Sequence, residues 1–141
     1  MKTYEILQSK GTDVHSISPK ASINDVVTKL VAHNCGSLLV MENGLLVGII
    51  TERDILRCCA SDDRALKDIP VSDKMTRRLV TASPADSVSD VMRLMTQNRV
   101  RHLPIVEGDE LAGLISIGDA VKAQHDELSL ENEHLKTYLH G

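Results

Sequence analysis

Two stretches of the chain place a hydroxyl residue at the end of an apolar run and a carboxylate three residues later. They are Gly48–Asp54, with the sequence GIITERD, and Gly113–Asp119, with the sequence GLISIGD. A hydroxyl at a strand end and a carboxylate in the first helical turn lie close to unpaired backbone N–H groups. A ribose diol and phosphates could bind at such a place.

The same spacing occurs at two further places, from Ser22 to Asp25 and from Ser87 to Asp90. A Ser or Thr followed three residues later by an acidic residue is also a helix capping box, which satisfies backbone donors and binds no ligand. Because all four stretches share one spacing, the spacing alone does not separate a nucleotide site from a helix cap. Both interpretations stay open at this point.

The composition predicts a globular protein that binds no nucleic acid. The chain has 141 residues, of which 42% are hydrophobic, enough for one ordinary domain or two small halves with a shared core. It contains no Phe or Trp and has a net charge of -4, so it lacks both stacking platforms and positive charge.

The sequence also predicts no membrane segment. No apolar run reaches the about 18 residues of a membrane span, and no signal-peptide pattern is present. We therefore expect no membrane contact.

The nucleophilic and metal-binding residue types form no catalytic group. Cys35, Cys58 and Cys59 make neither a CxxC pair nor a Cys/His cluster, and their odd number does not suggest a disulfide framework. A reducing compartment, the cytoplasm, fits this pattern best. Because His33 and Cys35 do not share a helix face, Cys35 is better explained by core packing. No base, nucleophile and oxyanion donor occur together, so we expect no enzyme, no catalytic residue and no metal site.

A repeat organises most of the chain. Sliding the sequence by 65 positions aligns residues 14–57 with residues 79–122 without a gap, and identical pairs include Pro19 with Pro84 and Asp54 with Asp119. Local patterns in the first copy predict an extended piece, a helix, two strands joined by the Asn43-Gly44 turn, and a second helix. A first helix, 3–9, precedes the repeat. Within the first copy, the predicted ranges are 14–17 for the extended piece, 23–33 for the helix, 37–41 and 45–50 for the two strands, and 54–60 for the second helix.

An α/β (α+β) fold follows from this order. We expect two β-α-β-β-α repeats related by a pseudo-two-fold axis, because one half alone would be marginally stable. The predicted domains are 1–68 for the first repeat with the N-terminal helix, 69–124 for the second repeat, and 125–141 for a C-terminal helical extension.

The predicted extension carries an apolar stripe. The helix starting at Asp119 should continue to about Leu139, with Leu128, Leu135 and Tyr138 on the stripe and acidic residues elsewhere. Nothing in one copy of the fold is left to cover this stripe, so we expect it to pack on a second copy in a homodimer. The alternative is a solvated tail.

The doubled pattern resembles a known family. The stretches LVTASP at 79–84 and VRHLPIV at 100–106, together with the two Gly-x-Ile-(Thr/Ser)-x-x-Asp stretches, resemble a cystathionine-β-synthase (CBS) domain pair, or Bateman module. The resemblance covers roughly residues 3 to 125. Within the family, the sequence is similar to stand-alone CBS pairs of bacteria and plant organelles. It implies a disc-shaped dimer that binds adenosine-containing ligands in clefts between the two halves.

The resemblance also implies site residues. The Asp of each Thr/Ser-x-x-Asp stretch would hold the ribose hydroxyls, and the hydroxyl residue would lie near the phosphates. The second site would comprise Thr81, Ala82, Pro84, Arg101, His102, Leu103, Pro104, Ser116, Ile117 and Asp119. The first site would comprise Ser16, Ile17, Pro19, Gly36, Ser37, Leu38, Thr51, Arg53 and Asp54. The second site matches the family pattern better, because Arg101 and His102 lie where family members place basic residues toward the phosphates. The matching residues of the first site, Gly36 and Ser37, are uncharged.

Two functions follow from the resemblance. The first is a regulatory module that senses energy or redox state through an adenosine ligand such as AMP, ATP or NAD, and acts in trans on a partner protein. The alternative is a constitutive dimerisation or scaffold module with empty clefts. Neither requires an obligatory cofactor.

Overall fold

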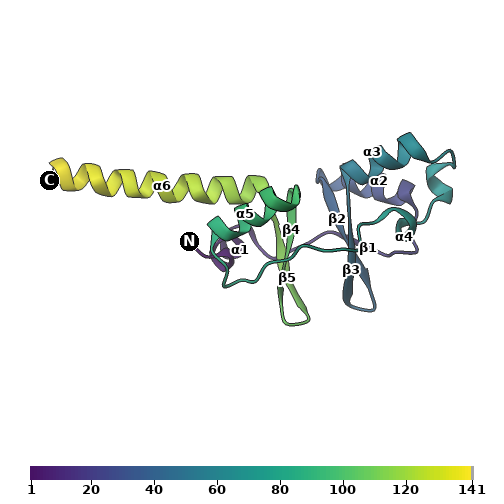
Figure 1. Cartoon of the computed structure of the whole chain (residues 1–141), viewed down its shortest axis with the longest axis horizontal. Coiled ribbons are helices and arrows are strands. Elements are labelled where there is room, and N and C mark those ends of the chain that lie inside the picture. Colours follow the sequence, from purple (N-terminus) through teal and green to yellow (C-terminus); the bar gives the residue numbers. More distant parts are fainter. Residues whose placement is uncertain (141) are drawn as a thin grey trace. The chain divides into compact units, whose positions relative to one another are not determined.

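The computed structural model describes residues 1–140, and their contacts divide into two units. Residues 13–79 form the first-repeat unit, and residues 1–12 together with those from 80 onward form the second-repeat unit. Each unit contains a β-hairpin with helices beside it (Figure 1). Among the described residues, no helix is long and apolar enough to cross a membrane.

The first-repeat unit is built on a three-stranded sheet of order β1-β2-β3, with β1 parallel to β2 and β3 antiparallel to it. The strands are followed or joined by α2 and α3, as the repeat predicts. Their bounds are β1 (Ser16–Ile17), α2 (Ile23–His33), β2 (Ser37–Glu42), β3 (Leu45–Thr51) and α3 (Glu52–Ser61).

The sequence explains these elements locally. Ser22 caps α2 by accepting a hydrogen bond from the Asp25 N–H, and Asn34 ends the helix in the left-handed conformation at φ 48°. Asn43 and Gly44 both have positive φ, as a two-residue hairpin turn requires. Cys58 is buried in the core of this unit, and burial raises the pKa of its thiol, so that it stays protonated.

The second-repeat unit has the same arrangement, but its sheet has two strands, and the equivalent of β1 is reduced to a single bridge. Strands β4 and β5 form an antiparallel hairpin, and Ala82 makes an isolated parallel bridge with Ile105. The bounds are α1 (Thr3–Lys10), α5 (Val88–Asn98), β4 (His102–Glu107), β5 (Glu110–Ser116) and α6 (Ile117–His140). The core of the unit combines Leu7 of α1 with buried residues of the hairpin and of α5.

The segment before each repeat packs on the other repeat. Helix α1 contacts β5 and α6, and Thr3 donates to the Asp86 carbonyl. The connector, with η1 (Leu66–Asp68) and the unforeseen short helix α4 (Val71–Lys74), packs on the first-repeat unit. This packing differs from the predicted ranges 1–68 and 69–124, because a segment's neighbours in sequence do not decide which sheet it covers.

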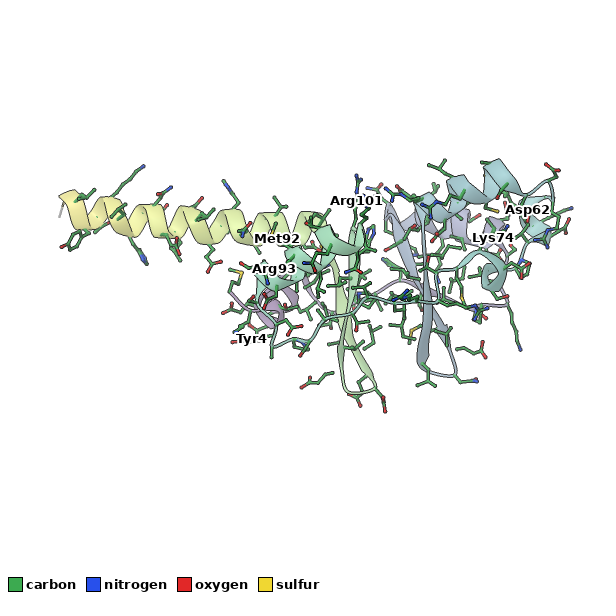
Figure 2. All side chains as sticks on the ribbon, in the orientation of Figure 1. Tyr4, Asp62, Lys74, Met92, Arg93 and Arg101 are labelled. Carbon is green, nitrogen blue, oxygen red and sulfur yellow. The ribbon has the colours of Figure 1, made fainter. Side chains whose placement is uncertain are left out.

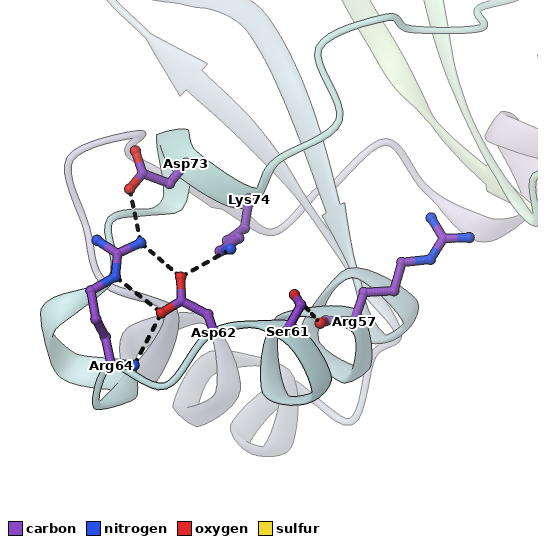
Figure 3. A network of polar contacts seen from close by, with 6 residues as sticks. All are labelled: Arg57, Ser61, Asp62, Arg64, Asp73 and Lys74. Atoms are coloured by element: carbon purple, nitrogen blue, oxygen red, sulfur yellow. Dashed lines mark hydrogen bonds and ion pairs between the residues drawn. The ribbon is translucent and has the colours of Figure 1, made fainter.

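A charged network holds the connector in place (Figure 3). Arg64 donates two hydrogen bonds to the Asp62 carboxylate, at 3.1 and 2.8 Å, and Lys74 of α4 lies 3.0 Å from it. Arg64 also reaches Asp73 at 3.3 Å. The hydrogen bonds from Arg64, with a smaller contribution from Lys74, hold the pKa of Asp62 far below its usual range. This network ties the end of α3 to α4.

The two matching glycines give a test of how these segments pack. A Cβ at Gly48 would lie 3.0 Å from the Thr76 carbonyl oxygen, whereas one at Gly113 would meet only side-chain atoms of Leu7. The Thr76 carbonyl is fixed by the Ile49 N–H at 3.0 Å and cannot easily move. We expect Gly48→Ala to cost about 1–3 kcal/mol of unfolding free energy, and Gly113→Ala less, in chemical denaturation. Equal costs would contradict this account of the packing.

Candidate functional site

The end of the β4–β5 hairpin away from its turn brings together part of the predicted second site. His102 pairs with Ser116, and Leu103 with Ile115, at this end. The Ile117 N–H donates to the Arg101 carbonyl at 2.8 Å, which joins the start of α6 to the start of β4. Figure 2 shows Arg101 at this end of the hairpin, where its side chain is exposed.

Ser116 and Asp119 form a capping box at the start of α6. The Ser116 N–H donates to Asp119 Oδ2 at 2.9 Å, and the Asp119 N–H donates to Ser116 Oγ at 3.1 Å. The helix begins at Ile117, two residues earlier than predicted, because Ser116 is its N-cap and Asp119 already lies in its first turn. The capping interpretation of the spacing therefore holds at this helix.

Asp119 has one partner that a cap does not need. Lys10 Nζ, from α1, donates to Asp119 Oδ2 at 2.7 Å and to the Leu114 carbonyl at 2.8 Å. Burial favours the neutral form of Asp119, but hydrogen bonds from Lys10 and Ser116 outweigh it and hold the pKa of the carboxyl below its usual range. All hydrogen bonds given to this carboxylate by the described residues go to Oδ2, so Oδ1 can accept from a ligand.

The predicted base-binding segment lies along β4. The Ala82 N–H donates to the Pro104 carbonyl at 3.1 Å, and the Ala82 carbonyl accepts from the Val106 N–H at 2.8 Å. Successive residues of a strand direct these groups to opposite edges, so the backbone of Thr81 faces away from β4. Of the predicted residues, Thr81 is thus better placed than Ala82 to read the edge of a base. The Pro84 carbonyl accepts from the Tyr4 N–H of α1 at 3.0 Å.

The first-repeat unit has the same arrangement around Thr51 and Asp54. The Thr51 N–H donates to Asp54 Oδ2 at 2.9 Å, the Asp54 N–H donates to Thr51 Oγ1 at 3.3 Å, and Glu52 donates to the Gly36 carbonyl at 3.0 Å. Helix α3 begins at Glu52, two residues before the prediction. The Thr76 hydroxyl lies 3.5 Å from the other carboxylate oxygen of Asp54, Oδ1.

Several predicted site residues lie in the cores. Their side chains are buried, so that a ligand could reach them only through their backbone groups or at an edge: Ile17, Pro19, Ser37, Leu38, Ala82, Leu103 and Pro104. Arg53 is exposed in the first turn of α3, and Ser16 accepts a hydrogen bond from Lys29 through its carbonyl. Among the described residues, no group of three or more His, Cys, Asp or Glu side chains could hold a metal ion.

Comparison with known proteins decides the family. A family model described as CBS domain matches residues 7–61 and 66–126, which is most of the chain. The chain belongs to the CBS domain family. The resemblance seen in the doubled motif is thereby confirmed.

Relatives with CBS domains match most of the chain. A mitochondrial CBS domain-containing protein of Arabidopsis thaliana is 36% identical, covering 97% of this chain and 71% of its own length. The crystal structure of a CBS-domain protein of Agrobacterium tumefaciens is 37% identical with a TM-score of 0.84, over 88% of this chain and 99% of the other. A hexameric CBS-CP12 protein of cyanobacteria is 28% identical with a TM-score of 0.76, over 86% of this chain and 66% of the other.

Two residues of the candidate sites could not be found from the sequence. Lys10 contacts Asp119 across 109 positions, and Thr76 contacts Asp54 across 22. Neither lies within the repeat motif, and Lys10 has the sequence signature of an ordinary helix end. The repeat itself was the available signal. It implies that the segment before each copy packs in the same way, so that a side chain of each segment could contact the matching aspartate.

Proposed function

We propose that this CBS pair is a regulatory module that binds an adenosine nucleotide at the second-repeat unit and acts on a partner protein in trans. The observation that supports it most is the Asp119 carboxylate, which is kept ionised at a helix start and whose Oδ1 accepts no hydrogen bond from the described residues. A carboxylate in this state can accept hydrogen bonds from both hydroxyls of a ribose. CBS pairs commonly bind adenosine ligands and regulate partners, which favours the same conclusion.

The phosphate would lie at the start of α6. Ser116 and the helix N-terminus supply donors and the positive end of the helix dipole. Arg101 precedes the neighbouring strand and His102 is its first residue. The base would meet Thr81, Ala82 and Pro84. AMP, ATP and NAD all carry the adenosine and phosphate groups that this arrangement would recognise.

A homodimer is part of the proposal. Helix α6 has 24 residues and extends as a single helix past α1 and α5 (Figure 1). Leu128, Leu135 and Leu139 are more than half exposed on it. Apolar side chains of this size favour a partner that covers them, and a second α6 offers the same surface in return. The hexameric CBS-CP12 relative is an assembly of CBS chains. We place this module in the cytoplasm, which three free cysteines favour.

Thermal unfolding with added nucleotide tests the proposal. AMP at about 100 times its dissociation constant should stabilise the folded chain by roughly 2.7 kcal/mol and raise the melting temperature, with GMP giving a smaller shift. The alternative, a constitutive assembly module whose capping boxes only hold helices, predicts no shift with either. A melting temperature unchanged by AMP, ATP and NAD would contradict nucleotide sensing and support that alternative.

A further inference from the structure

In each unit, the carboxylate of the helix-starting capping box is contacted by a polar side chain from outside its own repeat. Lys10, at the end of α1, reaches Asp119, and Thr76, just after α4, reaches Asp54. The two aspartates are matching positions of the repeat. The two units are therefore built alike, and each brings a hydrogen-bond donor to its capping-box carboxylate from the segment that precedes the other repeat.

The two donors differ in charge. Lys10 brings an ammonium group and Thr76 a neutral hydroxyl, and the Thr76 contact is long at 3.5 Å compared with 2.7 Å for Lys10. No basic side chain contacts Asp54 among the described residues, since its partners are Thr51 and Thr76. An anion that approached Asp54 would meet an uncompensated carboxylate, whereas an anion that approached Asp119 would meet an ion pair.

Lys10 has capacity for another partner. An ammonium group carries three donors, of which two go to the Leu114 carbonyl and to Asp119 Oδ2. The side chain is 34% exposed, so the third N–H can reach a molecule from solvent. A ribose bound through Asp119 Oδ1 would place its phosphate within reach of the flexible lysine stem.

We propose that Lys10 contacts the ligand in the second-repeat site and makes that site selective for phosphorylated adenosine over the neutral nucleoside. The inference rests on the proposed function, because it assigns a residue to the same site. The selectivity comes from a charge-assisted hydrogen bond that AMP can accept and adenosine cannot. The first-repeat unit lacks this cation and should show little preference for the phosphate.

Titration calorimetry on matched variants tests the role of Lys10. With Lys10→Met, the affinity for AMP should fall by about tenfold or more, while the affinity for adenosine changes by less than about threefold. Arg93→Met is the control, because it removes one positive charge from the same unit at an exposed ion pair with Asp90 on α5 (Figure 2). It should leave the ratio of the two affinities unchanged. Lys10→Arg should restore part of the preference for AMP.

A purely structural ion pair would give another result. Lys10→Met would then lower the melting temperature and leave the ratio of AMP to adenosine affinity as in the wild type, which would overturn the inference. An increase in AMP affinity would overturn it too, since Lys10 would then be blocking the site. If the wild type binds neither compound, the proposed function fails together with the inference. Should Lys10→Met not fold, Lys10→Gln keeps a donor without the charge and must give the same loss for AMP.

Discussion

Asp119→Ala should weaken the binding of AMP by roughly 10- to 150-fold, because it removes charge-assisted hydrogen bonds to the ribose worth roughly 1.5–3 kcal/mol. The substitution also removes the hydrogen bond to the Ser116 N–H and the ion pair with Lys10, so a loss of stability of about 1 kcal/mol is expected besides. Titration calorimetry gives the first quantity and chemical denaturation the second.

Asp90→Ala is the matched control for this prediction. Asp90 occupies the same place in the capping sequence, and its N–H donates to Ser87 Oγ at 3.1 Å. Among the described residues, its carboxylate pairs with the exposed Arg93 alone. Asp90 lies in the first turn of α5, whose other end leads into β4. If the two alanine variants bind AMP equally well, Asp119 acts as a helix cap and the ribose assignment is wrong.

Leu128→Glu combined with Leu135→Glu should convert the proposed dimer to a monomer at micromolar concentration. Val121, Leu128 and Leu135 follow one another at seven-residue spacing, so they lie on nearly the same face of α6, and Leu139 lies beside them. Each is at least half exposed in the single chain. Two buried carboxylates without partners would cost more than such an interface gains. Sedimentation velocity measures the change.

Leu130→Glu tests whether the face matters. Leu130 is 55% exposed, compared with 56% for Leu128 and for Leu135, but it is two residues from Leu128 and so lies on the opposite face of the helix. The single variant should remain a dimer. A wild-type protein that sediments as a monomer, or a Leu130→Glu variant that dissociates as completely as the double variant, would rule out dimerisation through this stripe.

Local chemistry allowed the repeated elements to be predicted from the sequence. The spacing of Ile23, Val26 and Leu30 gave α2, and the Asn43-Gly44 turn gave the hairpin with its positive φ angles. The starts of α3 and α6 were predicted two residues late, because the carboxylate of each capping box was taken as the first helical residue. In the structure the preceding hydroxyl residue, Thr51 or Ser116, is the N-cap.

Packing over long sequence separations could not be predicted. Helix α1 covers the second-repeat hairpin and α4 the first, although the chain order suggests the reverse. The same contacts bring Lys10 to Asp119 and Thr76 to Asp54. Nothing in the local pattern of these residues specifies a partner, because hydrophobic periodicity shows which face of a segment is buried and not what it is buried against.

The most direct measurement is a calorimetric titration of AMP into the wild type, Asp54→Ala and Asp119→Ala. These two variants alter the same position of the repeat, and each removes a carboxylate that accepts from its own capping hydroxyl residue. We expect the higher-affinity binding of AMP, which we assign to the second-repeat unit and call the tight phase, to persist in Asp54→Ala and to be lost in Asp119→Ala. If the tight phase instead disappears with Asp54→Ala, or if the wild type gives no binding heat, the assignment of a nucleotide site to the second-repeat unit is contradicted.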